Sequence, residues 1–177
     1  MKKEVLIHFL FLIALFALVT LVKDWFDLIY LPFWFGGILG TILPDVDHLI
    51  YVYMLAPKEQ TSQDVAGLIS KSDWKASLTL LAETRSERTN LIFHTAHFQI
   101  LFLAFALLVI TSSGSLLGRG LVLAFLLHLL IDEVVDFIET GNLSNWFNKI
   151  QISLDKEQMR WYLIANIVVL LIFGFLL

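Results

Sequence analysis

The chain contains no cysteine and little charge. Without cysteine, none of its 177 residues can form a disulfide or bind a metal ion as a thiolate, so any metal must be held by histidine and carboxylate. Only 16% of the residues are charged, whereas a soluble domain has about 25%. The net charge of −4 provides no basic surface, which argues against a nucleic-acid partner.

Apolar residues take the place of the missing charge. They make up 58% of the chain, against about 45–50% in soluble domains, and the mean hydropathy is +0.81. The length suits one domain. We therefore expect residues 1–177 to form a single all-α integral membrane domain, a polytopic helical bundle with about five transmembrane helices.

Five apolar stretches approach the length of about 20 residues that a membrane span requires. The first is longer than a signal-peptide core and no cleavage site follows it, so it is expected to be retained. Pro44 interrupts the second and predicts a broken span, while Gly36 and Gly40 have a spacing typical of close helix packing. The polar loop 58–90 contains an amphipathic segment, expected on the membrane surface. The expected spans are residues 5–22, 28–43, 91–110, 121–138 and 161–177.

The basic residues predict the orientation of these spans. If the N-terminus is inside, all but two of the 12 lysines and arginines fall in inner segments, and only Lys23 and Arg119 lie outside. An excess of lysine and arginine marks the cytoplasmic side of a membrane protein. We therefore expect a cytoplasmic N-terminus, a cytoplasmic 58–90 loop and an external C-terminus.

All five histidines lie on apolar segments, and carboxylates accompany several of them. An ionisable group inside a bilayer costs roughly 2.5–3.5 kcal/mol on insertion scales, so such residues indicate a functional site. With a rise of about 1.5 Å per residue, four separate segments place histidine or aspartate in the same leaflet. Histidine with aspartate is a ligand set of divalent metals. The candidate metal ligands are His8, Asp45, Asp47, His48, His94, His128 and Asp132, and the candidate catalytic bases are Asp136 and Glu133.

Some of these residues also fit simpler roles. His8 alone could be a helix-packing residue that hydrogen-bonds to a neighbouring helix. Asp45 or Asp47 could cap a helix that begins after Pro44. His97 shares a helix face with His94 and could replace it as a ligand. We favour His94 because it lies nearer the expected depth of the other ligands.

Three short motifs resemble a known family. They are a histidine near the start of the first span, the run Pro44-Asp45-Val46-Asp47-His48, and His128-Leu-Leu-Ile-Asp132. In this order they are similar to the membrane-bound metal-dependent hydrolases of bacteria and archaea, a family that includes a LexA-regulated inner-membrane protein. The family's His-Arg-x-x-Thr-His-Ser motif is represented here by His94-Thr95, without the His-Arg pair. The resemblance implies a metal-dependent hydrolase in the cytoplasmic membrane of a prokaryotic cell.

The expected chemistry is metal-assisted hydrolysis. One or two divalent ions, with Zn²⁺ as the first choice, would lower the pKa of a bound water and polarise an ester or phosphoryl oxygen. Seven candidate ligands exceed the four that one tetrahedral zinc needs, so either two ions or outer-shell carboxylates are expected. A site at the depth of lipid head groups indicates a phosphoester or other amphiphilic substrate in the cytoplasmic leaflet.

Two other functions use the same kinds of ligand. A divalent-cation transporter would need a polar path through the outer leaflet, and the outer halves of the expected spans are almost entirely apolar. Paired histidines on facing helices also suit haem, but axial haem ligation does not need the adjacent carboxylates. The sequence therefore favours the hydrolase over either alternative.

Overall fold

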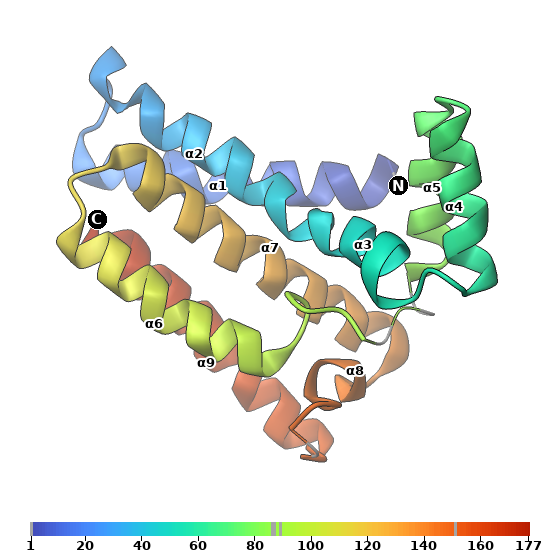
Figure 1. Ribbon diagram of the computed structural model, residues 1–177. Coiled ribbons are helices and arrows are strands. Elements are labelled where there is room, and N and C mark those ends of the chain that lie inside the picture. Colours follow the sequence, from blue (N-terminus) through green and yellow to red (C-terminus); the bar gives the residue numbers. More distant parts are fainter. Residues whose placement is uncertain (1, 86–87, 89, 151) are drawn as a thin grey trace.

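The computed structural model describes residues 2–85, 88, 90–150 and 152–177, and every regular element among them is a helix. Five long helices run along a common direction (Figure 1). Helix α7 lies at the centre, in contact with each of the other four. The five are α1 (Lys2–Lys23), α2 (Leu31–Ile42), α6 (Ala96–Ser112), α7 (Leu116–Thr140) and α9 (Lys156–Leu176).

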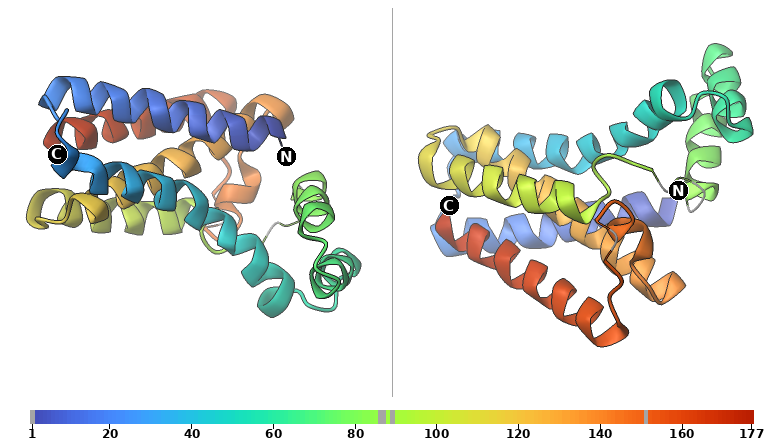
Figure 2. Two further views of the ribbon diagram at one scale, coloured as in Figure 1. Left: turned by 90° about the horizontal axis from the view of Figure 1, so that it is seen from above. Right: turned by 60° about the horizontal axis from the view of Figure 1, so that its bottom comes forward.

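The two termini lie at opposite ends of the bundle (Figures 1 and 2). At the C-terminal end, Lys23 Nζ donates to the carbonyl oxygen of Phe175 at 2.8 Å, and Arg119 donates to that of Leu177 at 3.1 Å. Basic groups are favourable at the C-terminus of a helix, where carbonyls lack partners within the helix. The other end, which holds the start of α1, we call the N-terminal end.

Within the described residues, three stretches are long and apolar enough to cross a membrane, namely Val5–Lys23, Leu28–Leu55 and Lys156–Leu176. Helix α6 is apolar but shorter, with 17 residues, and α7 has 25 residues that include several acidic ones. The all-helical fold agrees with the sequence, and the three apolar helices are consistent with a membrane protein. The larger count of five spans stays a prediction.

The second span is irregular at the position that Pro44 predicts. Helix α2 ends at Ile42, a 3-10 turn η2 follows at Leu43–Asp45, and the chain continues through α3 (Val46–Ile50) and a π-helical turn η3 (Tyr51–Leu55). Proline has no backbone N–H to donate within a helix. The segment after Pro44 therefore follows α2 with a changed helical pitch, in agreement with the predicted break (Figure 1).

Two helices begin at residues other than the first residues of the expected spans. Helix α6 begins at Ala96 and not at Leu91, because Asp47 accepts hydrogen bonds from the backbone N–H groups that precede it. Helix α9 begins at Lys156 and not at Trp161, because Asp155 forms a capping box with Gln158. The contacts with Asp47 thus delay the start of α6, and the capping box at Asp155 lets α9 start earlier in the chain.

The polar 58–90 loop contains two helices at the N-terminal end, α4 (Gln60–Ser70) and α5 (Trp74–Glu83). They lie beside each other, next to the start of α1 (Figure 2). Their small apolar core consists of Val52, Val65 and Leu81. The expected amphipathic segment is thus a helical pair, and the end of α5 leads directly to Arg85.

Helices α2 and α7 approach each other closely through glycines. A Cβ atom at Gly36 or Gly40 would collide with backbone carbonyls of α7, and one at Gly120 would collide with the carbonyl of Phe33. Only glycine permits such backbone contact. The predicted packing role of Gly36 and Gly40 therefore has a structural basis, and Gly120 completes the contact from α7.

This contact predicts the effect of a single added side chain. Gly120→Val should lower the stability of the detergent-solubilised protein by about 1–3 kcal/mol or more, because its Cβ meets backbone that cannot move aside. Gly67→Ala is the matched control, since a Cβ there has no neighbour within 4 Å. It should leave stability unchanged or raise it by up to about 1 kcal/mol. Thermal unfolding measures both, and equal midpoints for Gly120→Val and wild type would contradict the contact.

Candidate metal centre

Three buried side chains from α1 and α7 converge at the N-terminal end. The ligand atoms of His8, His128 and Asp132 all lie within 4.8 Å of one another. His8 Nε2 is 3.1 Å from Asp132 Oδ1, and His128 Nε2 is 3.3 Å from Asp132 Oδ2. The two imidazole rings stack with their centroids 4.1 Å apart. We call these three residues the His–Asp group.

His94 joins this group from the segment before α6. Its Nε2 lies 3.1 Å from Asp132 Oδ2, and its Nδ1 lies 3.2 Å from Asp47 Oδ2. Asp47 is fully buried and also accepts the backbone N–H groups of Ile92 and Phe93, at 3.0 and 2.6 Å. A carboxylate on the far nitrogen of a histidine is the usual orienting partner of a metal ligand. Asp47 thus fixes the ring of His94, with Nε2 directed at Asp132.

The tautomer of His128 shows what the group can bind. Its Nδ1 lies 2.7 Å from the carbonyl oxygen of Thr41. Because a carbonyl only accepts, Nδ1 carries the hydrogen, and Nε2 of the neutral ring holds a lone pair. The Nε2 atoms of His128 and His94 are buried and make no hydrogen bond to the described residues, although Asp132 is close. A lone pair and a carboxylate repel each other unless a cation binds both, so these residues fit a metal ion.

The raised pKa of His94 also indicates a position that favours a cation. This residue lies between helices, in the segment that precedes α6. Burial alone would lower the pKa of its imidazole, but the nearby carboxylates of Asp132 and Asp47 raise the pKa to about 9. Two carboxylates therefore favour a positive charge at this position, as a proton or as a bound cation.

The remaining candidate ligands lie around the group at greater distance. Asp45 has a side chain that is 56% exposed, with Oδ1 3.7 Å from His128 Nε2. His48 is buried, accepts a hydrogen bond from Arg88 Nε at 3.1 Å, and has its ring centroid 5.3 Å from that of His94. His97 makes none of these contacts, and its Nδ1 has no hydrogen-bond partner in the described part of the chain. The structure therefore brings His94 to the centre in preference to His97.

Arg85 is a site residue that the sequence did not reveal. One guanidinium nitrogen lies 2.9 Å from Asp132 Oδ1, and the other lies 3.4 Å from Asp136 Oδ1. Its side chain is one-fifth exposed, so it lies at the edge of the buried group. Arg85 follows α5 and is 47 positions from Asp132, and no periodic pattern connects the two. Arg88, which positions His48, was missed for the same reason.

The two candidate bases on α7 contact different neighbours. Asp136 accepts a hydrogen bond from Trp146 Nε1 at 2.7 Å, supplied by the short helix α8 (Ser144–Phe147), and pairs with Arg85. Glu133 is fully buried among helices α6, α7 and α9, where it accepts hydrogen bonds from Gln99, Tyr162 and Asn166. The structure therefore brings Asp136 beside the His–Asp group and places Glu133 in a separate polar network.

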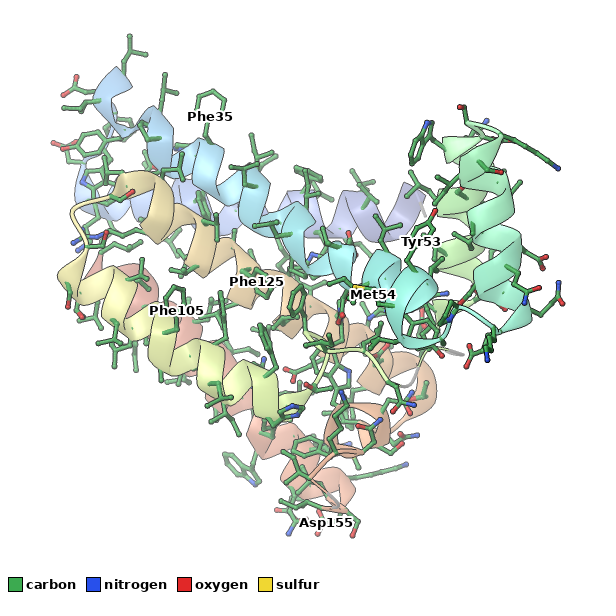
Figure 3. All side chains as sticks on the ribbon, viewed as in Figure 1. Phe35, Tyr53, Met54, Phe105, Phe125 and Asp155 are labelled. Carbon is green, nitrogen blue, oxygen red and sulfur yellow. The ribbon has the colours of Figure 1, made fainter. Side chains whose placement is uncertain are left out.

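Two cavities border the site, and Arg85 lines both. The larger, of about 480 Å³, is mainly apolar and reaches His8, His128 and Asp132. The smaller, of about 180 Å³, is lined by polar side chains that include His94 and Asp136. In Figure 3, many nitrogen and oxygen atoms lie below Met54, whereas carbon atoms predominate around Phe35 and Phe105. The site thus lies where an apolar and a polar cavity meet.

Adjacent residues on α7 give a matched test of the metal assignment. Asp132→Asn should lower metal affinity by more than the roughly 10–100-fold that loss of an outer-shell partner costs. Glu133→Gln should retain the metal, because Glu133 contacts only Gln99, Tyr162 and Asn166 among the side chains described above. Elemental analysis of the purified proteins after zinc loading measures both. Equal metal content in the two variants would contradict the assignment.

Comparison with known proteins adds no independent family assignment. No family model, curated protein or solved structure matches the chain. The resemblance of the Pro-Asp-Val-Asp-His and His-Leu-Leu-Ile-Asp motifs to a hydrolase family therefore stays a prediction. A function must therefore be inferred from the geometry of the site.

Proposed function

We propose that the protein is a membrane-embedded hydrolase that uses a divalent metal ion to cleave a phosphoester or a similar amphiphilic substrate. The observation that carries this proposal is the convergence of three histidine Nε2 atoms, from three separate segments, within 3.3 Å of the oxygens of Asp132. Buried ionisable groups are retained at such depth mainly for function. The adjoining cavities provide space for a substrate.

The donor set fits zinc best. Imidazole nitrogen and carboxylate oxygen are its common ligands, and His8, His94, His128 and Asp132 supply the four that a tetrahedral ion takes. One ion is the simplest case, and Asp45 and His48 lie near enough to support a second. When bound, the ion supplies a water of lowered pKa and polarises the bond to be cleaved.

The remaining side chains divide the other tasks of hydrolysis. Asp136 borders the polar cavity and accepts the proton of the attacking water as general base. The guanidinium of Arg85 stabilises the negative charge that develops on the phosphoryl oxygens. Asp47 holds His94 in place and takes no part in proton transfer. This division explains why Asp136 and Arg85 lie together at the edge of the buried group.

We also propose that the protein lies in the membrane with its N-terminus in the cytoplasm. Five alternating spans with a cytoplasmic N-terminus would place the site in the cytoplasmic leaflet, as the lysine and arginine distribution favours. The family resemblance suggests a prokaryotic cytoplasmic membrane. A cysteine introduced at position 71 should then react with an impermeant reagent only from the inside, and the absence of native cysteine makes the background clean.

A cation transporter is less well supported than a hydrolase. Transit would require polar groups along the bundle beyond the His–Asp group. Among the described residues, the buried side chains there are mainly apolar, and they include Phe16, Phe33 and Leu123. The aromatic pair Phe16 and Phe33 stacks with its ring centroids 4.2 Å apart and fills the space between α1 and α2. This packed aromatic core would oppose the passage of an ion along the bundle.

Hydrolysis of a small chromogenic phosphodiester tests the proposal. Zinc-loaded protein should be active, lose activity to a chelator and regain it with Zn²⁺. Asp136→Asn should lower kcat by about 10²–10⁴-fold, the range for a general base, with metal content retained. Asp64→Asn, an exposed carboxylate on α4, is the control and should match wild type. Activity that survives chelation, or full activity in Asp136→Asn, would count against the mechanism.

A further inference from the structure

The larger cavity is an apolar groove that leads from the surface to the His–Asp group. Its walls come from α1, from the α2–α3 segment and from α5. Most of its lining side chains are apolar, and the polar ones include His8, His128, Asp132 and Arg85. We call this cavity the apolar groove, and its principal lining residues are Val5, Phe9, Ile42, Leu49, Trp74 and Leu78.

The rim of the groove faces outward with apolar side chains. Val5, Leu49 and Leu78 are 48%, 38% and 52% exposed, and Trp74 is 58% exposed. Val5 and Leu49 belong to stretches that are long and apolar enough to cross a membrane, whereas Trp74 and Leu78 lie on helix α5 of the 58–90 loop. On the side of Val5 and Leu49 the rim is therefore continuous with the surface that would contact lipid, and an acyl chain can enter there sideways without passing through water.

The charged side chains beside the His–Asp group suit the phosphate head group of a lipid. Arg85 lines both the apolar groove and the polar cavity, and it lies 2.9 Å from Asp132. Guanidinium groups bind phosphate oxygens in a bidentate manner. A molecule with its phosphate at Arg85 can extend a hydrocarbon chain into the groove. The rest of its head group can then occupy the polar cavity beside Thr140 and Asn145.

We propose that the substrate is a membrane phospholipid, held with one hydrocarbon chain in the apolar groove and its phosphate at Arg85 and the His–Asp group. This inference rests on the proposed hydrolase function and adds the substrate class. In the reaction, the oxygen of water bonds to phosphorus and the phosphorus–oxygen bond to the leaving alcohol breaks. The proton that Asp136 accepts from water passes to that alcohol, so one ester and one water give a phosphate and an alcohol.

A soluble phosphoester fits the site less well. It would leave the groove unfilled, although burial of each methylene improves binding from water by about fourfold. Filling the groove should therefore lower kcat/KM for a long-chain substrate more than for a short-chain one. Leu78→Trp and Ile42→Trp add bulk from two different helices, at residues outside the metal ligands. Leu101→Trp adds the same bulk on α6, at an exposed position that lies outside both cavities.

The experiment compares the ethyl and dodecyl esters of p-nitrophenyl phosphate at one detergent concentration. Each groove variant should lower kcat/KM for the dodecyl ester by roughly tenfold or more, the equivalent of two methylenes. All variants should still cleave the ethyl ester, which shows that they fold and hold metal. Leu101→Trp should match wild type on both esters. Equal rates on the dodecyl ester in wild type and in both groove variants would overturn the proposal.

A binding measurement separates this inference from the hydrolase proposal. A dodecyl phosphonate with a brominated chain cannot be hydrolysed, and it should quench the fluorescence of Trp74 when its chain occupies the groove. The part of the quenching that comes from Trp74 should be missing in Trp74→Phe and reduced in Ile42→Phe, which adds bulk to the groove without adding another tryptophan. Quenching without hydrolysis of any ester would leave the lipid site standing and reject the hydrolase. Hydrolysis of the ethyl ester without quenching would reject the lipid site alone.

Discussion

The positions of the other site residues depend on their contacts with the carboxylate of Asp132. It is 2% exposed and lies within 3.3 Å of imidazole nitrogens from His8, His94 and His128, and within 2.9 Å of Arg85. A buried carboxylate costs several kcal/mol unless it is paired. The four partners come from α1, α7 and two inter-helix segments, so satisfying this one charge holds these parts of the chain together at the N-terminal end.

The backbone contact between α2 and α7 makes this arrangement possible. Gly36, Gly40 and Gly120 let the two helices approach until His128 reaches the carbonyl of Thr41 at 2.7 Å. That hydrogen bond fixes which ring nitrogen faces Asp132. Helix packing therefore decides the chemistry of the site, because a slightly wider separation would leave the His128 ring free to rotate and its Nε2 without a fixed direction.

Much of the site could be predicted from sequence because its members stand out against an apolar background. His128 and Asp132 share a helix face, and His8 is an isolated polar residue on α1. The role of Asp47 could not be predicted, because it depends on backbone N–H groups 45 to 47 positions away. The same contacts displaced the start of α6. Arg85 lies in no periodic pattern, and the choice between Asp136 and Glu133 requires knowing which helices pack on each face of α7.

The X-ray absorption spectrum of the zinc-loaded protein would identify the ligands of the metal ion. We expect nitrogen and oxygen ligands at about 2.0–2.2 Å, with the outer-shell scattering that imidazole rings produce. Three rings should be present in wild type and one fewer in His128→Ala, whereas His97→Ala should give the wild-type spectrum. A first shell without imidazole scattering, or a spectrum unchanged by His128→Ala, would contradict a metal centre built on Asp132 and its three histidines.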